Sequence, residues 1–144
     1  MSAGRGSPKT GGARKADLIR AVMEGVNFGV RHLDETMQRG AGARTQELCA
    51  VGGGTRNPWW QQLKADVLGI PITTRVVADV AAQGAALLAG IGVGLFAHEA
   101  EAIARADHPK VCYVVDAAKH AQYADAYREV FVKLYPGLKT MALN

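Results

Sequence analysis

The sequence predicts one α/β domain with a mainly parallel sheet. The expected order of elements is helix, strand, helix, strand, helix, helix, an alternation typical of layered α/β proteins. Apolar residues make up 49% and charged residues 21% of the 144 residues, an ordinary balance for one globular domain with a buried core. The third observation is a glycine-rich turn between the first strand and its following helix, a common place for ligands.

A long amphipathic helix is predicted to open the domain near Lys15. Apolar residues recur there at steps of three or four, as on the core-facing side of a helix: Leu18, Val22, Val26, Val30, Leu33 and Met37. Gly40 and Gly42 supply the stop. Residues 1–14 are predicted to be a disordered leader because Met1–Ala13 is rich in Gly and Ser and lacks a hydrophobic period. The domain itself is expected to span residues 15–144.

Two strands with a helix between them follow. Leu48–Val51 is a short apolar run typical of a buried strand, and the β-favouring residues of Pro71–Val77 predict the second. Asn57 is expected to cap the helix between them, with Pro58 as its first residue and Gly69 after its end. Two strands make a thin sheet, because three or more are normally needed for independent stability. We therefore expect strands to be missing.

The second half of the chain is predicted to be mostly helical. Asp79 can cap a helix of small residues, and Val80–Ala97 is expected to be buried in the protein rather than in a membrane because it is short and contains Gln83. Residues 98–115 mix charged and apolar side chains, with an extended stretch at Val111–Val115. A last helix is expected over Ala117–Leu134, with Pro136-Gly137 as its stop.

Charge and cysteine usage exclude several classes of function. The net charge of +4 is small and dispersed, which gives little support for nucleic-acid binding. Cys49 and Cys112 form no CxxC pair and have no histidine at ligand spacing, which argues against a disulfide framework and a zinc site. We expect a protein of a reducing compartment, the cytoplasm, with neither nucleic acid nor membrane as a partner.

The most informative segment is the turn Val51–Trp60, with Gly52, Gly53 and Gly54 followed by the helix start at Asn57. Glycine lets backbone approach a ligand closely, and a helix N-terminus offers free N–H groups and partial positive charge that suit a phosphate. A tight strand-to-helix turn with Asn57 as a mere cap explains the residues equally well. Neither a Walker A sequence nor GxGxxG is present.

Three ordered blocks nevertheless resemble the FGGY family of carbohydrate kinases. Residues 52–71 resemble the family pattern of a glycine turn, a helix with Gln and Ala-Asp, and Leu-Gly-x-Pro. Residues 81–94 resemble its next block, a Gly-Ala-Ala helix ending in glycine. Residues 17–24 resemble the end of its second signature, and residues 123–136 look like its C-terminal helix.

The resemblance implies an actin-like, RNase H-like fold, of which this chain is part of the second domain. It implies ATP or ADP as ligand, with Mg²⁺ entering with the nucleotide and no metal ligand in this chain. Gly52, Gly53 and Gly54 are implied to line the nucleotide, and Asn57 stands where the glycerol kinase branch has a nucleotide-contacting Asn. The wording of residues 60–71 looks most like xylulokinase, which implies a pentulose as the sugar.

Several parts of the family pattern are absent from the sequence. The catalytic base, the sugar site, the first phosphate loop and the strands that open the second domain all belong to an N-terminal part, so we expect a domain truncated at its N-terminal strands and negligible kinase activity. No catalytic residue is assigned to this chain. The alternative function is a non-catalytic α/β module with an idle nucleotide loop, which forms a homo-oligomer through its exposed face. A single-domain Rossmann-type binder has little support.

The other candidate side chains have ordinary structural explanations. Asp66 and Asp125 are expected to be solvated helix residues, Asp79 a cap and Arg56 a solvated cation. Glu24 belongs to the family signature and is expected to face the missing half. Trp59 and Trp60 could stack on adenine, although core or interface positions are commoner for such a pair. The four histidines show no ligand pattern and are expected on the surface or in loops: His32, His98, His108 and His120.

Overall fold

The computed structural model describes residues 14–75, 77, 79–106 and 108–142. Apart from Arg14, the predicted leader 1–14 lies outside these residues. Helix α1 spans Lys15–Ala41 and begins where the backbone N–H of Arg14 donates to Asp17 at 2.9 Å. It ends at Gly42, whose φ of 65° is in the left-handed region that glycine adopts without strain. The opening helix and its glycine stop are therefore as predicted.

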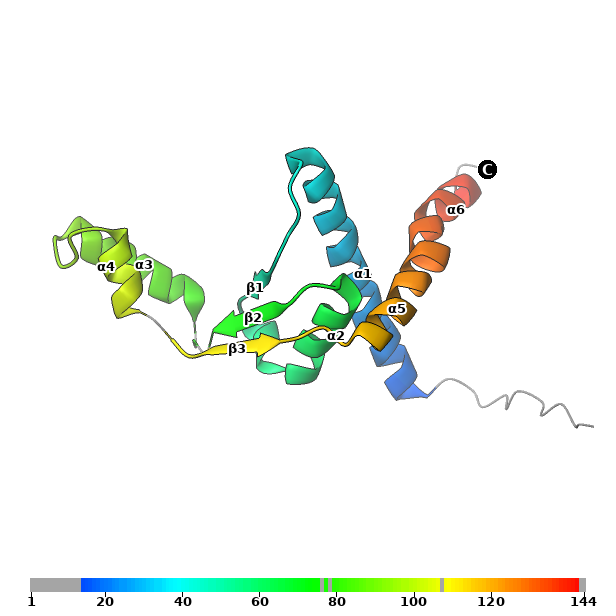
Figure 1. The fold of residues 1–144 in the computed structure, drawn as a ribbon, viewed down its shortest axis with the longest axis horizontal. Helices are drawn as coiled ribbons and strands as arrows, with labels where there is room; N and C mark the ends of the chain where they lie inside the picture. The colour runs from blue at the N-terminus through cyan, green and yellow to red at the C-terminus, as the bar shows by residue number, and fades with distance from the viewer. Residues whose placement is uncertain (1–13, 76, 78, 107, 143–144) are drawn as a thin grey trace, which may run out of the picture.

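Three strands form one mixed sheet in the order β1-β2-β3 (Figure 1). Strands β1 (Leu48–Ala50) and β2 (Ile72–Arg75) pair in parallel, as expected, but β3 (Lys110–Tyr113) pairs antiparallel with β2. The sheet is therefore mixed and not mainly parallel, and the extended stretch predicted at Val111–Val115 overlaps its third strand, β3. The chain leaves the sheet at Arg75 and returns through the helices α3 and α4 to Lys110, which pairs with Arg75, so β3 begins where β2 ends and runs back beside it.

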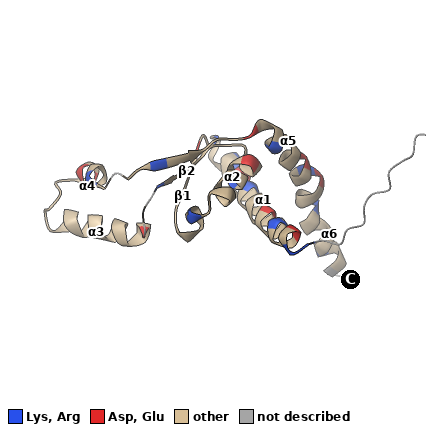
Figure 2. Cartoon of the chain, turned by 90° about the horizontal axis from the view of Figure 1, so that it is seen from below, with Lys and Arg blue, Asp and Glu red and all other residues tan. Residues whose placement is uncertain are grey.

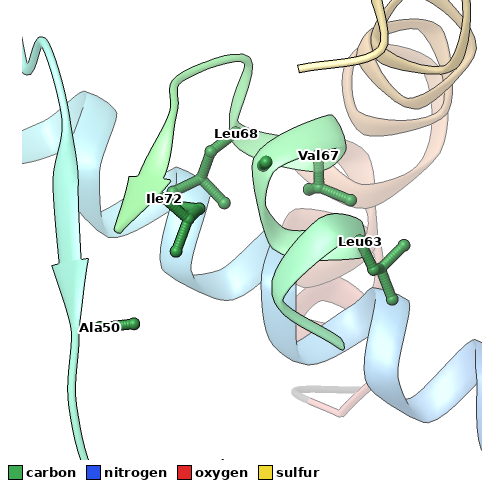
Figure 3. Packing of buried hydrophobic residues seen from close by; sticks show 6 residues of the cluster. Ala50, Leu63, Val67, Leu68 and Ile72 are labelled. Atoms are coloured by element: carbon green, nitrogen blue, oxygen red, sulfur yellow. The ribbon is translucent and has the colours of Figure 1, made fainter. Parts of the chain in front are cut away.

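Helix α2 (Pro58–Leu68) covers one face of this sheet and supplies most of the core. Asn57 caps it by accepting from the backbone N–H of Trp60, and Gly69 ends it with φ 75°, both as predicted. The buried hydrophobic cluster comes from α2 and the adjoining strands (Figure 3): Ala50, Leu63, Ala65, Val67, Leu68 and Ile72.

Most of the apolar stripe predicted on α1 does not pack. Of its members only Val30 packs against the core cluster, beside Met23 and the fully buried Asn27, and the other five are exposed. The face of α1 that packs against the core therefore lies to one side of the predicted stripe on the helix surface. The described sheet ends at β1, so no described strand lies over the stripe.

Helices α3 (Val80–Gly92) and α4 (Glu99–Arg105) project together to one side of the sheet (Figures 1 and 2). Asp79 caps α3 by accepting from the backbone N–H of Ala82, as predicted. The expected burial of α3 is wrong, because Gly90 is its one buried residue. A single neighbour, the short α4, leaves the rest of its surface uncovered. No helix of the described residues is long and apolar enough to cross a membrane.

The C-terminal helix is longer than predicted. It runs through α5 (Ala117–Ala126), the π-helical segment η2 (Tyr127–Phe131) and α6 (Val132–Ala142), with Pro136 inside α6. The expected stop at Pro136-Gly137 is therefore wrong. A proline removes one N–H bond and crowds the carbonyl four residues back. Pro136 is the fifth residue of α6, so the carbonyl that it crowds is that of Val132, the first residue after the π-helical segment η2.

Candidate functional site

The glycine turn joins the end of β1 to the start of α2 through a short 3-10 helix, η1 (Gly53–Arg56). Gly52 has φ 91°, a backbone conformation that side-chain-bearing residues rarely adopt. Thr55 fixes the turn because its hydroxyl and its backbone N–H both donate to the carbonyl of Gly52, at 2.7 and 3.1 Å. The first N–H groups of η1, those of Gly53 and Gly54, have no intrahelical acceptor.

The turn borders a hollow of about 560 Å³ whose other wall is the start of α3. A Cβ built at Gly52 or Gly53 would meet no atom within 4 Å, whereas one at Gly54 would lie 3.2 Å from the Trp60 ring. Gly52 and Gly53 therefore keep backbone open to the hollow, and Gly54 makes room for packing. The hollow is lined by Val51, Gly52, Gly53, Arg56, Asp79, Val80 and Ala81.

Asn57 does not line this hollow. Its side-chain oxygen accepts from the backbone N–H of Trp60 at 3.3 Å, and its own N–H donates to the carbonyl of Gly54 at 3.4 Å. The carbonyl of Gly54 also accepts from the buried side chain of Gln61 at 2.8 Å. Asn57 and Gln61 thus hold the shape of the turn. Sequence reasoning singled out Asn57 but missed Gln61, whose burial only packing reveals.

Two charged groups of the hollow come from different elements. Arg56 is exposed and reaches the hollow from η1, and Asp79 reaches it from the N-terminus of α3. Sequence reasoning treated both as ordinary residues, a solvated cation and a cap. With the open backbone of Gly53, they offer hydrogen-bond donors, a cation and an acceptor within one concavity.

Neither tryptophan lines this hollow. Trp60 packs against the core cluster, and its ring lies beside Gly54 and 5.7 Å from the Lys64 ammonium. Burial lowers the pKa of Lys64. Trp59 is 48% exposed and lines a separate hollow with Arg20. The core interpretation therefore holds for Trp60.

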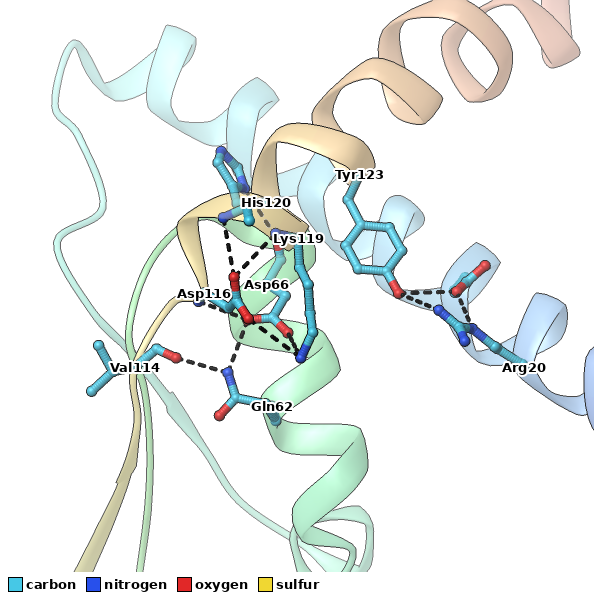
Figure 4. A network of polar contacts seen from close by, with 10 residues as sticks. Arg20, Gln62, Asp66, Val114, Asp116, Lys119, His120 and Tyr123 are labelled. Carbon is cyan, nitrogen blue, oxygen red and sulfur yellow. Dashed lines mark hydrogen bonds and ion pairs between the residues drawn. The ribbon is translucent and has the colours of Figure 1, made fainter.

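A second polar cluster surrounds Asp66, between α2 and α5 (Figure 4). Asp66 is only 2% exposed, so the expectation of a solvated residue is wrong. Its carboxylate accepts from the side chain of Gln62 at 2.8 Å and from the backbone N–H of Asp116 at 3.0 Å, and Lys119 lies 4.0 Å away. His120 contacts its backbone carbonyl at 2.9 Å. These contacts make Asp66 a structural link between α2 and α5.

Glu24 faces α5 in the described structure. It accepts from Arg20 at 2.7 Å and from the hydroxyl of Tyr123 at 3.0 Å, so its expected orientation toward a missing half is not observed. Burial raises the pKa of Tyr123, and the hydrogen bond from Arg20 opposes that shift. Asp125 has a side chain that is 72% exposed and pairs with Arg128, as expected of a solvated residue.

Comparison with known proteins agrees with this architecture. The model of the FGGY family of carbohydrate kinases, C-terminal domain, matches residues 2–93. A glycerol kinase from Dechloromonas aromatica (strain RCB) is 36% identical over 123 residues, which cover 84% of this chain and 24% of that kinase. A glycerol kinase from Solidesulfovibrio magneticus is 41% identical over 92 residues, which cover 64% of this chain and 18% of that kinase.

A solved xylulose kinase from Rhodospirillum rubrum has the same fold. It superposes with a TM-score of 0.75 at 28% identity, covering 97% of this chain and 28% of that kinase. The chain thus spans about a quarter of the length of such relatives, 24% for the first glycerol kinase. Its mixed α/β architecture is part of the actin-like fold of these kinases. The chain therefore belongs to the FGGY family of carbohydrate kinases, and residues 2–93 are its match to the family's C-terminal domain.

Proposed function

We propose that this chain is the nucleotide-binding part of an ATP-dependent carbohydrate kinase. The observation that carries the proposal is the open backbone of Gly52 and Gly53 in a hollow between β1 and the starts of η1 and α3. The space beside these glycines is what a Cβ would fill, so it fits close approach of a ligand. Membership of the FGGY family makes a nucleotide the ligand to test first.

The residues of the hollow match the chemistry of an adenine nucleotide. The backbone N–H of Gly53 and the Arg56 guanidinium can donate to phosphate oxygens. The carboxylate of Asp79 can accept from a ribose hydroxyl or an adenine amine. Asn57, predicted from the sequence to touch the nucleotide, would act through the shape of the turn. Mg²⁺ would arrive with the phosphates and needs no ligand from this chain.

The phosphorylated substrate is proposed to be a small polyol or ketose. The sequence relatives named above are glycerol kinases, whereas the structural relative is a xylulose kinase. The assignment of xylulose as the sugar therefore stays a prediction from the resemblance of residues 60–71 to xylulokinases. Phosphoryl transfer requires positioned substrate and charge stabilisation on both sides of the phosphate. We expect this chain alone to bind nucleotide without transferring phosphate, and xylulose or glycerol phosphorylation by the purified chain would contradict that.

Calorimetric titration of the chain with Mg-ADP tests the nucleotide site. We expect weak but saturable binding that is lost in Gly53→Val, because the added side chain enters the hollow. Gly92→Val is the matched control, since its Cβ also meets open space but lies at the other end of α3, away from the hollow. Absence of binding to the unaltered chain, or binding that survives Gly53→Val, would refute the proposed site.

A further inference from the structure

A second hollow, of about 360 Å³, lies between η1 and the strands β2 and β3. It is named here the β3 hollow, and its walls include Thr55, Arg56, Thr74, Arg75, Val111 and Tyr113. Thr74 lies two residues from the core residue Ile72 on β2, so the hollow is on the sheet face that α2 covers. Arg56 also borders the hollow at the glycine turn, and the two hollows share no other described residue. An inference about the β3 hollow therefore does not rest on the proposed function.

The β3 hollow lies away from the uncovered face of α1. Helix α1 is in the same layer as α2, since Met23 and Val30 pack against the core cluster (Figure 3). Right-handed crossovers whose helices lie on one face of a sheet all step across it in the same direction, and α2 carries the chain from β1 to β2. A parallel strand joined to β1 through α1 would therefore pair with the other edge of β1. Such a strand leaves the hollow at β2 and β3 unfilled.

Thr74 is the wall residue that most clearly indicates a ligand. It is only 4% exposed and stands opposite Val111 in the register of β2 and β3. Within residues 14–75, 77, 79–106 and 108–142, no group forms a hydrogen bond with its hydroxyl. Buried side-chain polar groups nearly always have a partner. A polar atom bound in the hollow would supply the partner that the described protein does not.

The charges around the hollow favour an anion. Arg56 and Arg75 line it, and Lys110 is the register partner of Arg75. None of the lining residues that the structure describes carries a carboxylate, whereas the hollow at the glycine turn includes Asp79. A guanidinium donates readily to phosphate oxygens, and the hydroxyl of Thr74 can donate to the same group from another side.

The rest of the hollow suits an organic body. Val111 and Tyr113 are two residues apart on β3, so they lie on the same face of the sheet, and both line the hollow. A volume of about 360 Å³ is in the range of small-molecule sites and is larger than a free phosphate ion requires. We propose that the β3 hollow binds a small phosphate monoester, with its phosphate on Arg56 and Thr74 and its organic part on Val111 and Tyr113.

Calorimetric titration of the chain with phenyl phosphate tests this site, because the probe joins a phosphate to a small planar body. We expect saturable binding that Thr74→Val weakens at least about 10-fold, since the change removes a hydroxyl donor to a charged group. Val111→Asp should abolish binding by placing a carboxylate beside the phosphate. Val114→Asp is the matched control, because Val114 is 68% exposed and does not line the hollow. Circular dichroism should show an unchanged fold, since Val111 is also exposed.

The variant Gly53→Val separates this site from the proposed nucleotide site. It should bind phenyl phosphate as tightly as the unaltered chain does, even though we expect it to lose Mg-ADP. Loss of phenyl phosphate binding in Gly53→Val would mean that the probe occupies the hollow at the glycine turn, and would overturn the second site.

Three further outcomes would contradict the proposal. Absence of phenyl phosphate binding to the unaltered chain, or binding that survives both Thr74→Val and Val111→Asp, would overturn the site itself. Equal affinity for phenyl phosphate and inorganic phosphate would overturn the assignment of an organic ligand. Failure of Mg-ADP to bind while phenyl phosphate binds as expected would refute the nucleotide site and leave the β3 hollow supported.

Discussion

The body of the molecule, made of α1, α2, the sheet and α5, differs from the arm formed by α3 and α4. The body buries a cluster of six hydrophobic residues and the polar link around Asp66. In the arm the buried residues are Gly90 and Ala102, and Leu88 and Ile103 are at least 60% exposed. Stability should therefore reside in the body. The candidate site lies where the two regions meet, because Gly53 belongs to the body and Asp79 begins the arm.

Truncation of a core residue should show the largest contrast between these regions. Ile72 is fully buried at the centre of the sheet, and Ile72→Ala should lower the free energy of unfolding by about 2–5 kcal/mol, through lost burial and a cavity. Ile103→Ala removes the same atoms from the exposed face of α4 and should change it by less than about 0.5 kcal/mol. Urea unfolding followed by circular dichroism measures both, and equal losses would mean that the arm shares the core.

The polar link within the body should give the next effect. Asp66→Ala leaves the side chain of Gln62 and the backbone N–H of Asp116 without their common acceptor, which should cost about 1–3 kcal/mol. Asp125→Ala removes an exposed carboxylate paired with Arg128 and should cost less than about 1 kcal/mol. If the two variants unfold at the same urea concentration, Asp66 does not join α2 to α5.

Replacement of two glycines of the arm by alanine should change its stability in opposite directions. Gly84→Ala places a methyl group in open space within α3 and should stabilise that helix by about 0.5–1 kcal/mol. At Gly90 the same methyl would lie 2.6 Å from the Phe96 ring and should loosen the arm. Amide hydrogen exchange of α3 should slow in the first variant and quicken in the second. The same response in both would contradict this packing.

The smallest expected effect is a pH dependence at the start of α5. The hydrogen bond from the backbone N–H of Lys119 is the main cause that lowers the pKa of Asp116 below its ordinary value of 3.8. A lowered pKa in the folded state gives stability that is present above 3.8 and is lost as the pH falls through the folded value. Asp116→Asn keeps a capping side chain without a charge.

Thermal unfolding of Asp116→Asn between about pH 6 and pH 3 should therefore show a shallower loss of stability than the unaltered chain. Parallel curves for the two proteins would rule out this contribution of Asp116. Asp116 lies at the surface of the body, so we expect its substitution to change the stability less than the substitution of the buried Asp66.

The starts of α2 and α3 and the ends of α1 and α2 could be predicted from the sequence because they depend on neighbouring residues, whereas the predicted end of the last helix at Pro136-Gly137 was wrong. Asn57 and Asp79 cap α2 and α3, and Gly42 and Gly69 end α1 and α2 in left-handed conformations. The glycine turn and the family resemblance could also be recognised from short runs of neighbouring residues. Of the four predicted nucleotide residues, Gly52 and Gly53 line the hollow, whereas Gly54 and Asn57 do not.

What the sequence determined by itself was thus the chemistry of short segments and the family they resemble. Only the tertiary structure decided which side of α1 is covered, that Asp66 is buried, that β3 runs antiparallel and that Asp79 faces the glycine turn. The physical reason is the distance along the chain between the residues that interact. A cap or a left-handed glycine is fixed by contacts within one helical turn, whereas burial and strand direction depend on segments far apart in the chain.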